Sequence, residues 1–470
     1  MSQINVDRVK NRAGTGSPTF TNGIVVSGVG TFSSQVSIAG TLTYEDVTNV
    51  DSVGVITARE GIRIGAGKSI GSDGAAVVYY GDGSNLTNVG VDTSTVDAST
   101  LQVSGISTFK SDVRVTGNLN AGITTTSSLV NATPLSHRNL IINGAMQIAQ
   151  RASSSTVAGY GDLDRWKHEY AGTDANPTFS QVPVVSSDSG DNPYAVGLTT
   201  CARITNADQS SDLQASSLIN FNQQIEAQYI RNSGWNYNSS SSYITLSYYV
   251  KASVTQEYHG FVKTQNGTNY AYPFSLGTLT ANTWTRIIKT IPGNSNLQID
   301  ASTVGGFQVF PVFFAGTNYT NDSITEDAWA AWASGNRSHD QTATWYNTNG
   351  ATFEITGVQL EVGPVATPFE HRHIADELFL CQRYHLEAHQ FMQWSGQAES
   401  GQTYYGHLQF PTTMRANPSC TSTFLSSRGF PTTAGSVGDI SVHGCGLGLV
   451  SNSSDNGAYF YRYITATAEI

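Results

Sequence analysis

Two stretches of the chain carry residue types that bind phosphate or calcium in other proteins. Gly65-Ala66-Gly67-Lys68-Ser69 has the composition of a phosphate loop, but the first glycine of that motif would fall at Ile62. Asn206 to Asp212 places oxygen-bearing side chains at alternate positions, as a calcium loop does. Ser211 stands where that loop needs glycine, and Ser217 where it needs glutamate. The spacing therefore favours a plain β turn in the first stretch and a polar turn in the second.

Carboxylate pairs are the next candidates for chemistry, because glycoside hydrolysis uses two of them at a fixed separation. The pairs in this chain are Asp162/Asp164, Glu326/Asp327 and Glu354/Glu361. Their separations depend on the tertiary fold, and most carboxylates fall at turns, where solvated side chains are the ordinary interpretation. We therefore expect no catalytic residues and no enzyme activity, with glycan cleavage kept as an alternative.

His371 and His373 alternate around Arg372, just before a helical pattern. Alternate histidines could bind a metal on the axis of a trimer, whereas packing and hydrogen bonding at a helix start need no metal. We favour packing and expect neither a metal site nor a cofactor.

Aromatic residues beside amide and hydroxyl side chains form the clusters best suited to binding. The apolar face of a sugar ring lies against an aromatic ring, and nearby polar groups bind the hydroxyls. Such residues are also enriched at subunit interfaces, which is the competing explanation. The glycan-binding candidates in predicted loops and strand ends are Trp235, Tyr237, Tyr258, Tyr270, Tyr272, Trp329, Trp332, Trp345 and Tyr346.

The composition predicts an all-β protein of several domains. The chain has 470 residues, more than one core usually serves, and its charged fraction is 13% against a usual ~25%. Its net charge of −11 makes nucleic acid a poor partner. No window reaches the ~18 uncharged apolar residues of a membrane helix, so we expect no membrane insertion. The four cysteines are far apart and are expected to be buried free thiols.

An internal repeat marks the N-terminal part. Residues 26–43 recur without gaps as residues 103–120, an offset of 77 positions. The apolar residues of each copy alternate, as in a strand with one buried face. Short β units of this kind need partners, so we expect a thin β shaft in which identical chains wind together as a homotrimer.

The remaining chain shows longer strands and one helical pattern. Strand-like segments rich in aromatic residues extend from Asn139 to about Arg372, and they predict a β-sandwich. Ile374, Leu378 and Cys381 share a helical face with His385, so we expect one short helix over 373–388. Alternation then returns in residues 404–410 and 459–464, which predicts a small C-terminal β domain.

Three motifs in this part carry a family resemblance. Arg138 to Gly144, Asp164-Arg165-Trp166 and the stretch Phe353 to Tyr384 resemble the carbohydrate-binding-like jelly-roll region of tail fibres from tailed bacteriophages. The resemblance implies that Tyr243 to Lys251 and Asn282 to Trp284 form sandwich edges. It also implies that Trp166, Trp284 and Phe353 are packing residues.

Two further segments resemble parts of phage fibre and structural proteins, especially those of cyanobacterial phages. Val6 to Phe20 is similar to their N-termini, and Tyr79 to Val89 to a turn motif in their shafts. The expected organisation is a virion-attachment segment (1–45), a β-repeat shaft (46–137), a jelly-roll carbohydrate-binding-like domain (138–372), and a helix plus C-terminal β domain that forms the tip (373–470).

The resemblance implies a receptor-binding tail fibre. Its expected partners are other copies of itself, tail, baseplate or adaptor proteins at the N-terminus, and a host lipopolysaccharide or other surface glycan. Such a protein is assembled in the host bacterial cytoplasm and works in the virion. Two alternatives stay open: a structural tail or capsid decoration protein that binds no receptor, and a glycan depolymerase.

Overall fold

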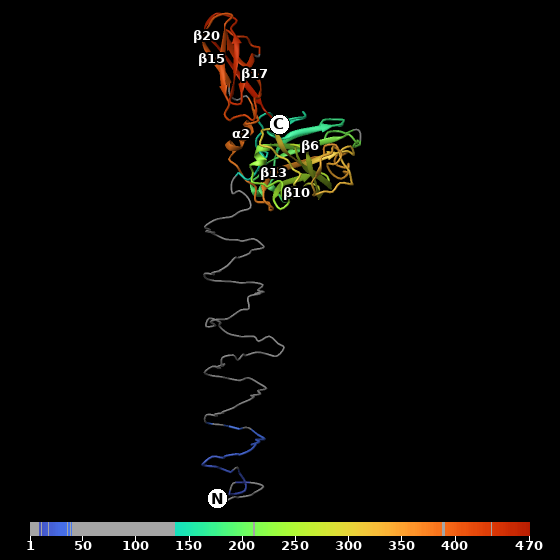
Figure 1. Ribbon diagram of the computed structural model, residues 1–470, viewed down its shortest axis with the longest axis vertical. Coiled ribbons are helices and arrows are strands. Elements are labelled where there is room, and N and C mark those ends of the chain that lie inside the picture. The colour runs from blue at the N-terminus through green and yellow to red at the C-terminus, as the bar shows by residue number, and fades with distance from the viewer. Residues whose placement is uncertain are drawn as a thin grey trace. The chain divides into compact units, whose positions relative to one another are not determined.

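The computed structural model describes residues 9–39, except 11, 17, 35 and 38, and residues 137–470, except 210–211, 388–390 and 434 (Figure 1). The chain divides into two compact units, Met1–Leu119 and Asn120–Ile470. The described residues of the first unit form turns and bends without a strand among them, and several of their apolar side chains, such as Val25 and Val29, are exposed. The second copy of the repeat, the predicted shaft and the glycine-rich stretch at 65–69 lie outside the described residues.

A β-sandwich forms the first part of the second unit, and its larger sheet has seven strands. They lie in the order β1 (Ser154–Ser155), β3 (Thr178–Pro183), β5 (Thr200–Thr205), β13 (Thr352–Val362), β7 (Tyr243–Ala252), β10 (Thr283–Pro292) and β4 (Ser189–Gly190). All pairs are antiparallel except β10 with β4. The expectation that β7 forms an edge is wrong, because β13 returns beside β7 and places it between two partners.

The second sheet of the sandwich has six strands, all antiparallel. Their order is β12 (Ala330–Ala331), β9 (Tyr270–Leu279), β8 (Gln256–Thr264), β11 (Gly305–Ala315), β6 (Leu218–Glu226) and β2 (Lys167–Ala171). A 3-10 helix, η2 (Pro193–Val196), and a single helical turn, α1 (Ala227–Arg231), interrupt the β order. The fold is thus the all-β sandwich that the sequence predicts.

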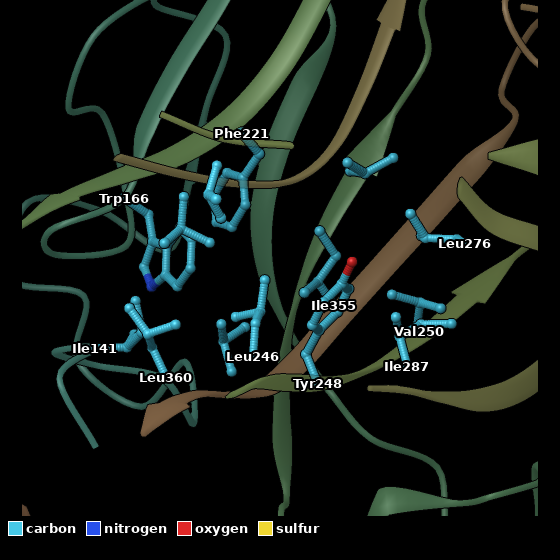
Figure 2. Close-up of a cluster of buried hydrophobic side chains, with 14 of the residues drawn as sticks. Ile141, Trp166, Phe221, Leu246, Tyr248, Val250, Leu276, Ile287, Ile355 and Leu360 are labelled. Atoms are coloured by element: carbon cyan, nitrogen blue, oxygen red, sulfur yellow. The ribbon is translucent and has the colours of Figure 1, made fainter. Parts of the chain in front are cut away.

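The core lies between these two sheets, as Figure 2 shows. Period-2 alternation directs Leu246, Tyr248 and Val250 of β7 inward, into the core cluster that also contains Phe221 of β6. Trp166, Trp284 and Phe353 are buried, as the resemblance implies, although Trp284 belongs to a small separate cluster with Cys201. Cys201, Cys381 and Cys445 are buried free thiols, whereas Cys420 is half-buried.

Two of the sequence motifs meet, although more than 200 positions separate them. Asn139 binds β13 through both ends of its amide: Nδ2 donates to the Val358 carbonyl at 3.0 Å, and Oδ1 accepts from the Leu360 amide at 3.0 Å. Glu370 accepts from the Asn139 amide, and Arg372 donates to the Asn139 carbonyl. The residues that carry the resemblance therefore form a clamp that ties the start of the sandwich to its last strand.

The C-terminal part forms two smaller sheets that enclose their own core. One contains β14 (His385–Leu386), β15 (Phe391–Ala398), β17 (Ser419–Arg428) and β20 (Asp455–Thr467); the other contains β16 (Thr403–Gln409), β18 (Ser436–Ser441) and β19 (Gly444–Val450). Met392, Leu447 and Phe460 are central to this core. The alternation predicted in the two C-terminal segments is confirmed by β16 and β20.

The helix before these sheets is shorter than expected. It is α2 (Ile374–Gln382), and it ends because His385 pairs with Thr467 and begins β14. Ile374 is exposed while Cys381 is buried, so the predicted apolar face is only partly correct. His373 caps the helix by accepting a hydrogen bond from the Ala375 amide.

Buried ion pairs join the C-terminal part to the sandwich. Arg383 donates to both carboxylate oxygens of Glu226, at 2.7 and 2.9 Å, and Tyr384 donates to the same carboxylate. Arg165 is fully buried, pairs with Glu469, and lies over the ring of Tyr384, with its guanidinium carbon 3.5 Å from the ring centroid. Removing one partner of such a pair strongly destabilises the folded state, because the remaining charge stays buried without a counterion.

Candidate functional site

Five of the nine aromatic candidates are buried in the sandwich core, with 0 to 4% of their surface exposed. They are Trp235, Tyr258, Tyr272, Trp345 and Tyr346. Trp345 stacks on Phe314 at a centroid distance of 3.7 Å, and the Tyr258 hydroxyl donates to the Val254 carbonyl. The rings lie in the core although polar residues flank several of them in the sequence, and one of these polar neighbours, His259, is itself buried. In this structure these five rings take part in core packing.

The other four candidates are half-buried and do not form one site. Trp329 donates through Nε1 to the Pro292 carbonyl and packs against Tyr272. Tyr270 begins β9 and packs against the core. Trp332 stacks on Phe261 at the face of the six-stranded sheet. Tyr237 lines a cleft, and we call the residues around it the loop cleft.

The loop cleft has a volume of about 390 Å³ and lies where three loops meet. Its lining residues are Arg231, Tyr237, Asn238, Asn266, Gly267, Leu297, Gln298, Ile299 and Asp300. They come from the end of α1 and the loop after it, from the β8–β9 turn, and from the β10–β11 loop. Small-molecule sites commonly enclose about 300–1,000 Å³, so the loop cleft is large enough to hold a sugar.

Close backbone approach holds two of these loops together. The Asn294 amide donates to the Tyr237 carbonyl at 2.7 Å, and Asn238 Nδ2 donates to the Leu297 carbonyl at 2.8 Å. A Cβ at Gly293 would lie 2.5 Å from the Ser239 carbonyl oxygen and 2.6 Å from that of Tyr237. Glycine is therefore required at position 293 for the loops to pack as they do.

Tyr237 is fixed in orientation from two sides. Its hydroxyl donates to the Ile299 carbonyl at 3.2 Å, and its ring meets the buried ring of Trp235 edge-on, at 6.2 Å and 65°. The Trp235 indole nitrogen in turn donates to the Ser242 carbonyl. Trp235 thus supports the aromatic wall of the loop cleft, although it is too deeply buried to form that wall itself.

Polar groups of both kinds line the loop cleft near Tyr237. The hydrogen bonds from Ser302 lower the pKa of Asp300, so this exposed carboxylate is charged at neutral pH. Asn266 donates through Nδ2 to Asp300 Oδ2 at 3.3 Å, while its buried Oδ1 has no partner within the described part of the chain. Arg231 donates through Nη1 to the Ile299 carbonyl, and its guanidinium group has further N–H donors.

This combination is suited to binding a neutral sugar. An aromatic ring offers the apolar contact, carboxylate and amide oxygens accept hydroxyl protons, and guanidinium nitrogens donate. Among the described residues that line the loop cleft, Asp300 is the single carboxylate, whereas glycoside hydrolysis uses two. The arrangement supports recognition without providing a hydrolytic pair.

The carboxylates considered from the sequence have partners elsewhere in the fold. Asp162 lies 2.7 Å from His168, and Asp164 accepts from Gln150. Glu354 binds Arg203 and Lys251, and Glu361 accepts from Thr367 and Gln359. Glu326 pairs with His259, and Asp327 with Lys289. Each of these carboxylates therefore has a neighbouring polar or charged side chain in the described part of the chain.

The other two sequence candidates also take part in packing. Asn206 donates through Nδ2 to carbonyls of the loop that contains Trp345 and Tyr346, and so serves loop closure. His371 donates a hydrogen bond through Nε2 to the Val196 carbonyl, and His373 caps α2.

Sequence reasoning missed Arg231, Asn266, Gln298 and Asp300. The sequence does contain turn signals around these residues, in Gln265-Asn266-Gly267 and in Gly293 to Asn296. Nothing in the sequence shows that these turns meet the loop containing Tyr237, because their meeting depends on the order of strands in the two sheets.

No protein-family model matches the chain, and no curated protein matches its sequence. Among solved structures, the enzymatically active domain of tailspike protein 4 from bacteriophage CBA120 is similar at 12% identity, covering 48% of this chain and 21% of that chain, with a TM-score of 0.24. This chain therefore spans about a fifth of the tailspike domain's length.

Two sugar-binding proteins give similar values. A putative sugar-binding protein from Bacteroides thetaiotaomicron matches at 11% identity, with 48% of this chain and 100% of that chain covered and a TM-score of 0.28. The carbohydrate-binding module TmCBM61, in complex with β-1,4-galactotriose, matches at 9% identity, with 48% and 99% covered and a TM-score of 0.23. Likenesses this weak do not decide what this chain binds.

Proposed function

We propose that this chain is a receptor-binding fibre protein of a tailed bacteriophage, and that its loop cleft binds a surface glycan of the bacterial host. The observation that carries the glycan site is the position of Tyr237. Its half-buried ring borders a cleft that is also lined by a charged carboxylate, a guanidinium and amide side chains. The phage role is supported by the three motifs that resemble tail-fibre proteins.

Those motifs fit the role in a physical sense as well. Asn139, Glu370 and Arg372 form the clamp that closes the sandwich, and Arg165 ties the sandwich to the C-terminal part. The resemblance therefore lies in residues that maintain the scaffold. The loop cleft is built from residues outside the motifs, as expected if fibres share a scaffold and differ in the glycan that they bind.

The proposed activity is binding without cleavage. A shallow cleft holds one sugar weakly, but several copies on one particle turn later contacts into intramolecular ones. Avidity of this kind raises overall binding by about 10² to 10⁴. A homotrimer would place three glycan sites on each fibre. Light scattering on the purified chain tests this: a mass of three chains supports the trimer, and a monomer mass contradicts it.

Adsorption to whole cells tests the receptor role. Fluorescently labelled protein is incubated with candidate cyanobacterial hosts before and after removal of their surface polysaccharide. We expect binding that disappears with the polysaccharide. Failure to bind any susceptible host would favour a structural virion protein, and shortened glycan in the supernatant would favour a depolymerase.

A further inference from the structure

Two cations share one aromatic ring at the outer face of the six-stranded sheet, the face turned away from the sandwich core. Lys263 of β8 has its ammonium nitrogen 4.1 Å from the centroid of Trp332, and the guanidinium carbon of Arg337 is 5.2 Å from the same centroid. Arg337 also lies 4.6 Å from the ring of Tyr319. We call these four residues the cationic cluster.

The alternation of β8 and its neighbours places Lys263 on this outer face. Lys263 pairs in register with Gln308 of β11, and the flanking Val262 and Val309 belong to the core. Trp332 follows β12 directly, and its amide donates to the Asn269 carbonyl, which holds the loop against the sheet. Phe261 stacks beneath the indole ring. The indole thus serves as a platform for the two cations.

The two cations have no carboxylate partner within 4 Å in the described part of the chain, although the protein as a whole carries a net charge of −11. Arg337 spends two of its five donors on Ser334. The negative charge of Glu169 favours the charged forms of both cations, but Glu169 is itself paired with Lys167 at 2.9 Å. The two positive charges are thus held together without a salt bridge of their own among the described residues.

Burial makes this arrangement costly without a counterion. Burial lowers the pKa of Lys263, and the positive charge of Arg337 lowers it further. Burial also lowers the pKa of Arg337. Both shifts mean that the charged forms are less stable here than when fully solvated in water. An anion placed between the two side chains would therefore stabilise both charges.

The same face carries a row of amide side chains that begins at Gln308, the register partner of Lys263. Gln308 donates to Asn222 Oδ1 at 2.9 Å, and Asn222 donates to Asn220 Oδ1 at 2.9 Å. This row of amides ends at Asn220 Nδ2, which is fully buried and has no acceptor among the described residues. The row continues the polar character of this face, but its buried end is not accessible to a ligand at the surface.

We infer that this face is a second binding site, which takes an anionic sugar unit, bearing a carboxylate or a sulfate ester, between Lys263 and Arg337. This inference deepens the proposed function, since it assumes that the ligand is a glycan. Long-range repulsion from the net negative charge does not prevent binding, because screening at physiological salt acts over about 8 Å. Charge-assisted hydrogen bonds at contact distance therefore contribute most to holding the anion.

Calorimetric titration of the full chain with three galactose-based oligosaccharides tests the inference. The probes are tetragalacturonate, a sulfated galactose tetramer and the neutral galactose tetramer. At least one anionic probe is expected to bind tenfold or more tighter than the neutral one, and added salt should weaken only that binding. Comparison of the two anionic probes shows whether carboxylate or sulfate is preferred.

Lys263→Met and Arg337→Gln, singly and together, are the decisive variants. Each single change should weaken anionic binding by about tenfold, and the double change should reduce it to the neutral level. Arg428→Gln is the matched control, because it removes a cation that is 63% exposed and paired with Asp455 in the C-terminal sheet. Arg337 lies in a loop, so its variant remains informative if Lys263→Met proves unstable.

The outcomes separate this inference from the proposed function. If the double variant binds the anionic probes as tightly as the wild type, or if charge makes no difference to binding, the second site is overturned. If anionic binding is lost in the double variant but Tyr237→Ala affects no sugar, the second site stands and the loop cleft is excluded as a glycan site.

Discussion

Asn266 and Asp300 form a polar pair that lines the loop cleft, with the amide nitrogen 3.3 Å from carboxylate oxygen Oδ2. Ser302 holds the other carboxylate oxygen through its amide and hydroxyl. The Asn266 amide oxygen is buried and has no partner within the described residues, whereas the exposed Asp300 carboxylate presents acceptors to whatever enters the cleft.

Replacing Asp300 should weaken glycan binding more than it weakens the fold. A hydrogen bond to a charged group is stronger than one between neutral groups, so Asp300→Ala should reduce affinity by about tenfold or more. Because Asp300 is exposed, the thermal unfolding temperature of the variant should hardly change. Titration calorimetry and a melting curve measure the two effects, and unchanged affinity would exclude Asp300 from the site.

Gly293 offers a test of the loop packing. In Gly293→Ala the new methyl group would meet two carbonyl oxygens at 2.5 and 2.6 Å, so the loops must separate and displace Tyr237. We expect lower stability and weaker binding together. Gly438→Ala is the control, since nothing lies within 4 Å of its added Cβ. Normal binding by Gly293→Ala would show that the loop cleft tolerates rearrangement.

Trp345 distinguishes packing from recognition among the aromatic candidates. Because its ring is fully buried and stacked on Phe314, Trp345→Ala should lower the free energy of unfolding by about 3–5 kcal/mol. Folded protein should still bind glycan at low temperature. Urea unfolding and calorimetry at 10–15 °C, a range chosen as near the usual stability maximum of about 10–20 °C, check both expectations. Lost binding in a folded variant would return Trp345 to the site.

The sequence was informative about the scaffold for a physical reason. Strand alternation in residues such as Leu246, Tyr248 and Val250 is a local pattern, and it is confirmed by their place in the core. The prediction that β7 lies at a sheet edge was wrong, because the order of strands depends on which distant strands pair with it. The predicted end of α2 was wrong because His385 pairs with β20, about 80 residues later in the chain.

The site was harder to predict than the scaffold. The sequence does not distinguish Trp235 from Tyr237, because both aromatic residues adjoin Asn236. Their difference in exposure arises because the loop turns Trp235 into the core while Tyr237 bonds to Ile299, a residue of another loop. A single sequence records neither that contact nor the partners Asn266 and Asp300.

Asp164 should make stability depend on pH. Burial raises the pKa of this carboxyl from 3.8 to about 6, against the hydrogen bonds from Gln150 and the charge of Arg151, which lower it. The folded state therefore binds the proton more tightly than the unfolded chain. The stability from this group is complete below about pH 4 and is lost as pH rises through 6.

Asp164→Asn mimics the protonated carboxyl and isolates this effect. The free energy of unfolding of the variant minus that of the wild type should rise between about pH 4 and 7, by up to about 3 kcal/mol. Other groups, such as His385, whose pKa burial lowers to about 4, largely cancel in this difference. Urea unfolding at several pH values measures it, and a difference that stays flat would contradict the assignment.

Titration of Tyr237→Ala with a glycan that the wild type binds tests the central claim most directly. The control is Tyr405→Ala, which removes a tyrosine that is 58% exposed on β16, outside the loop cleft. Loss of the stacking ring should weaken binding by about tenfold or more in Tyr237→Ala and leave Tyr405→Ala unchanged. Equal affinity of the wild type and folded Tyr237→Ala would contradict the account and place any glycan site elsewhere on the chain.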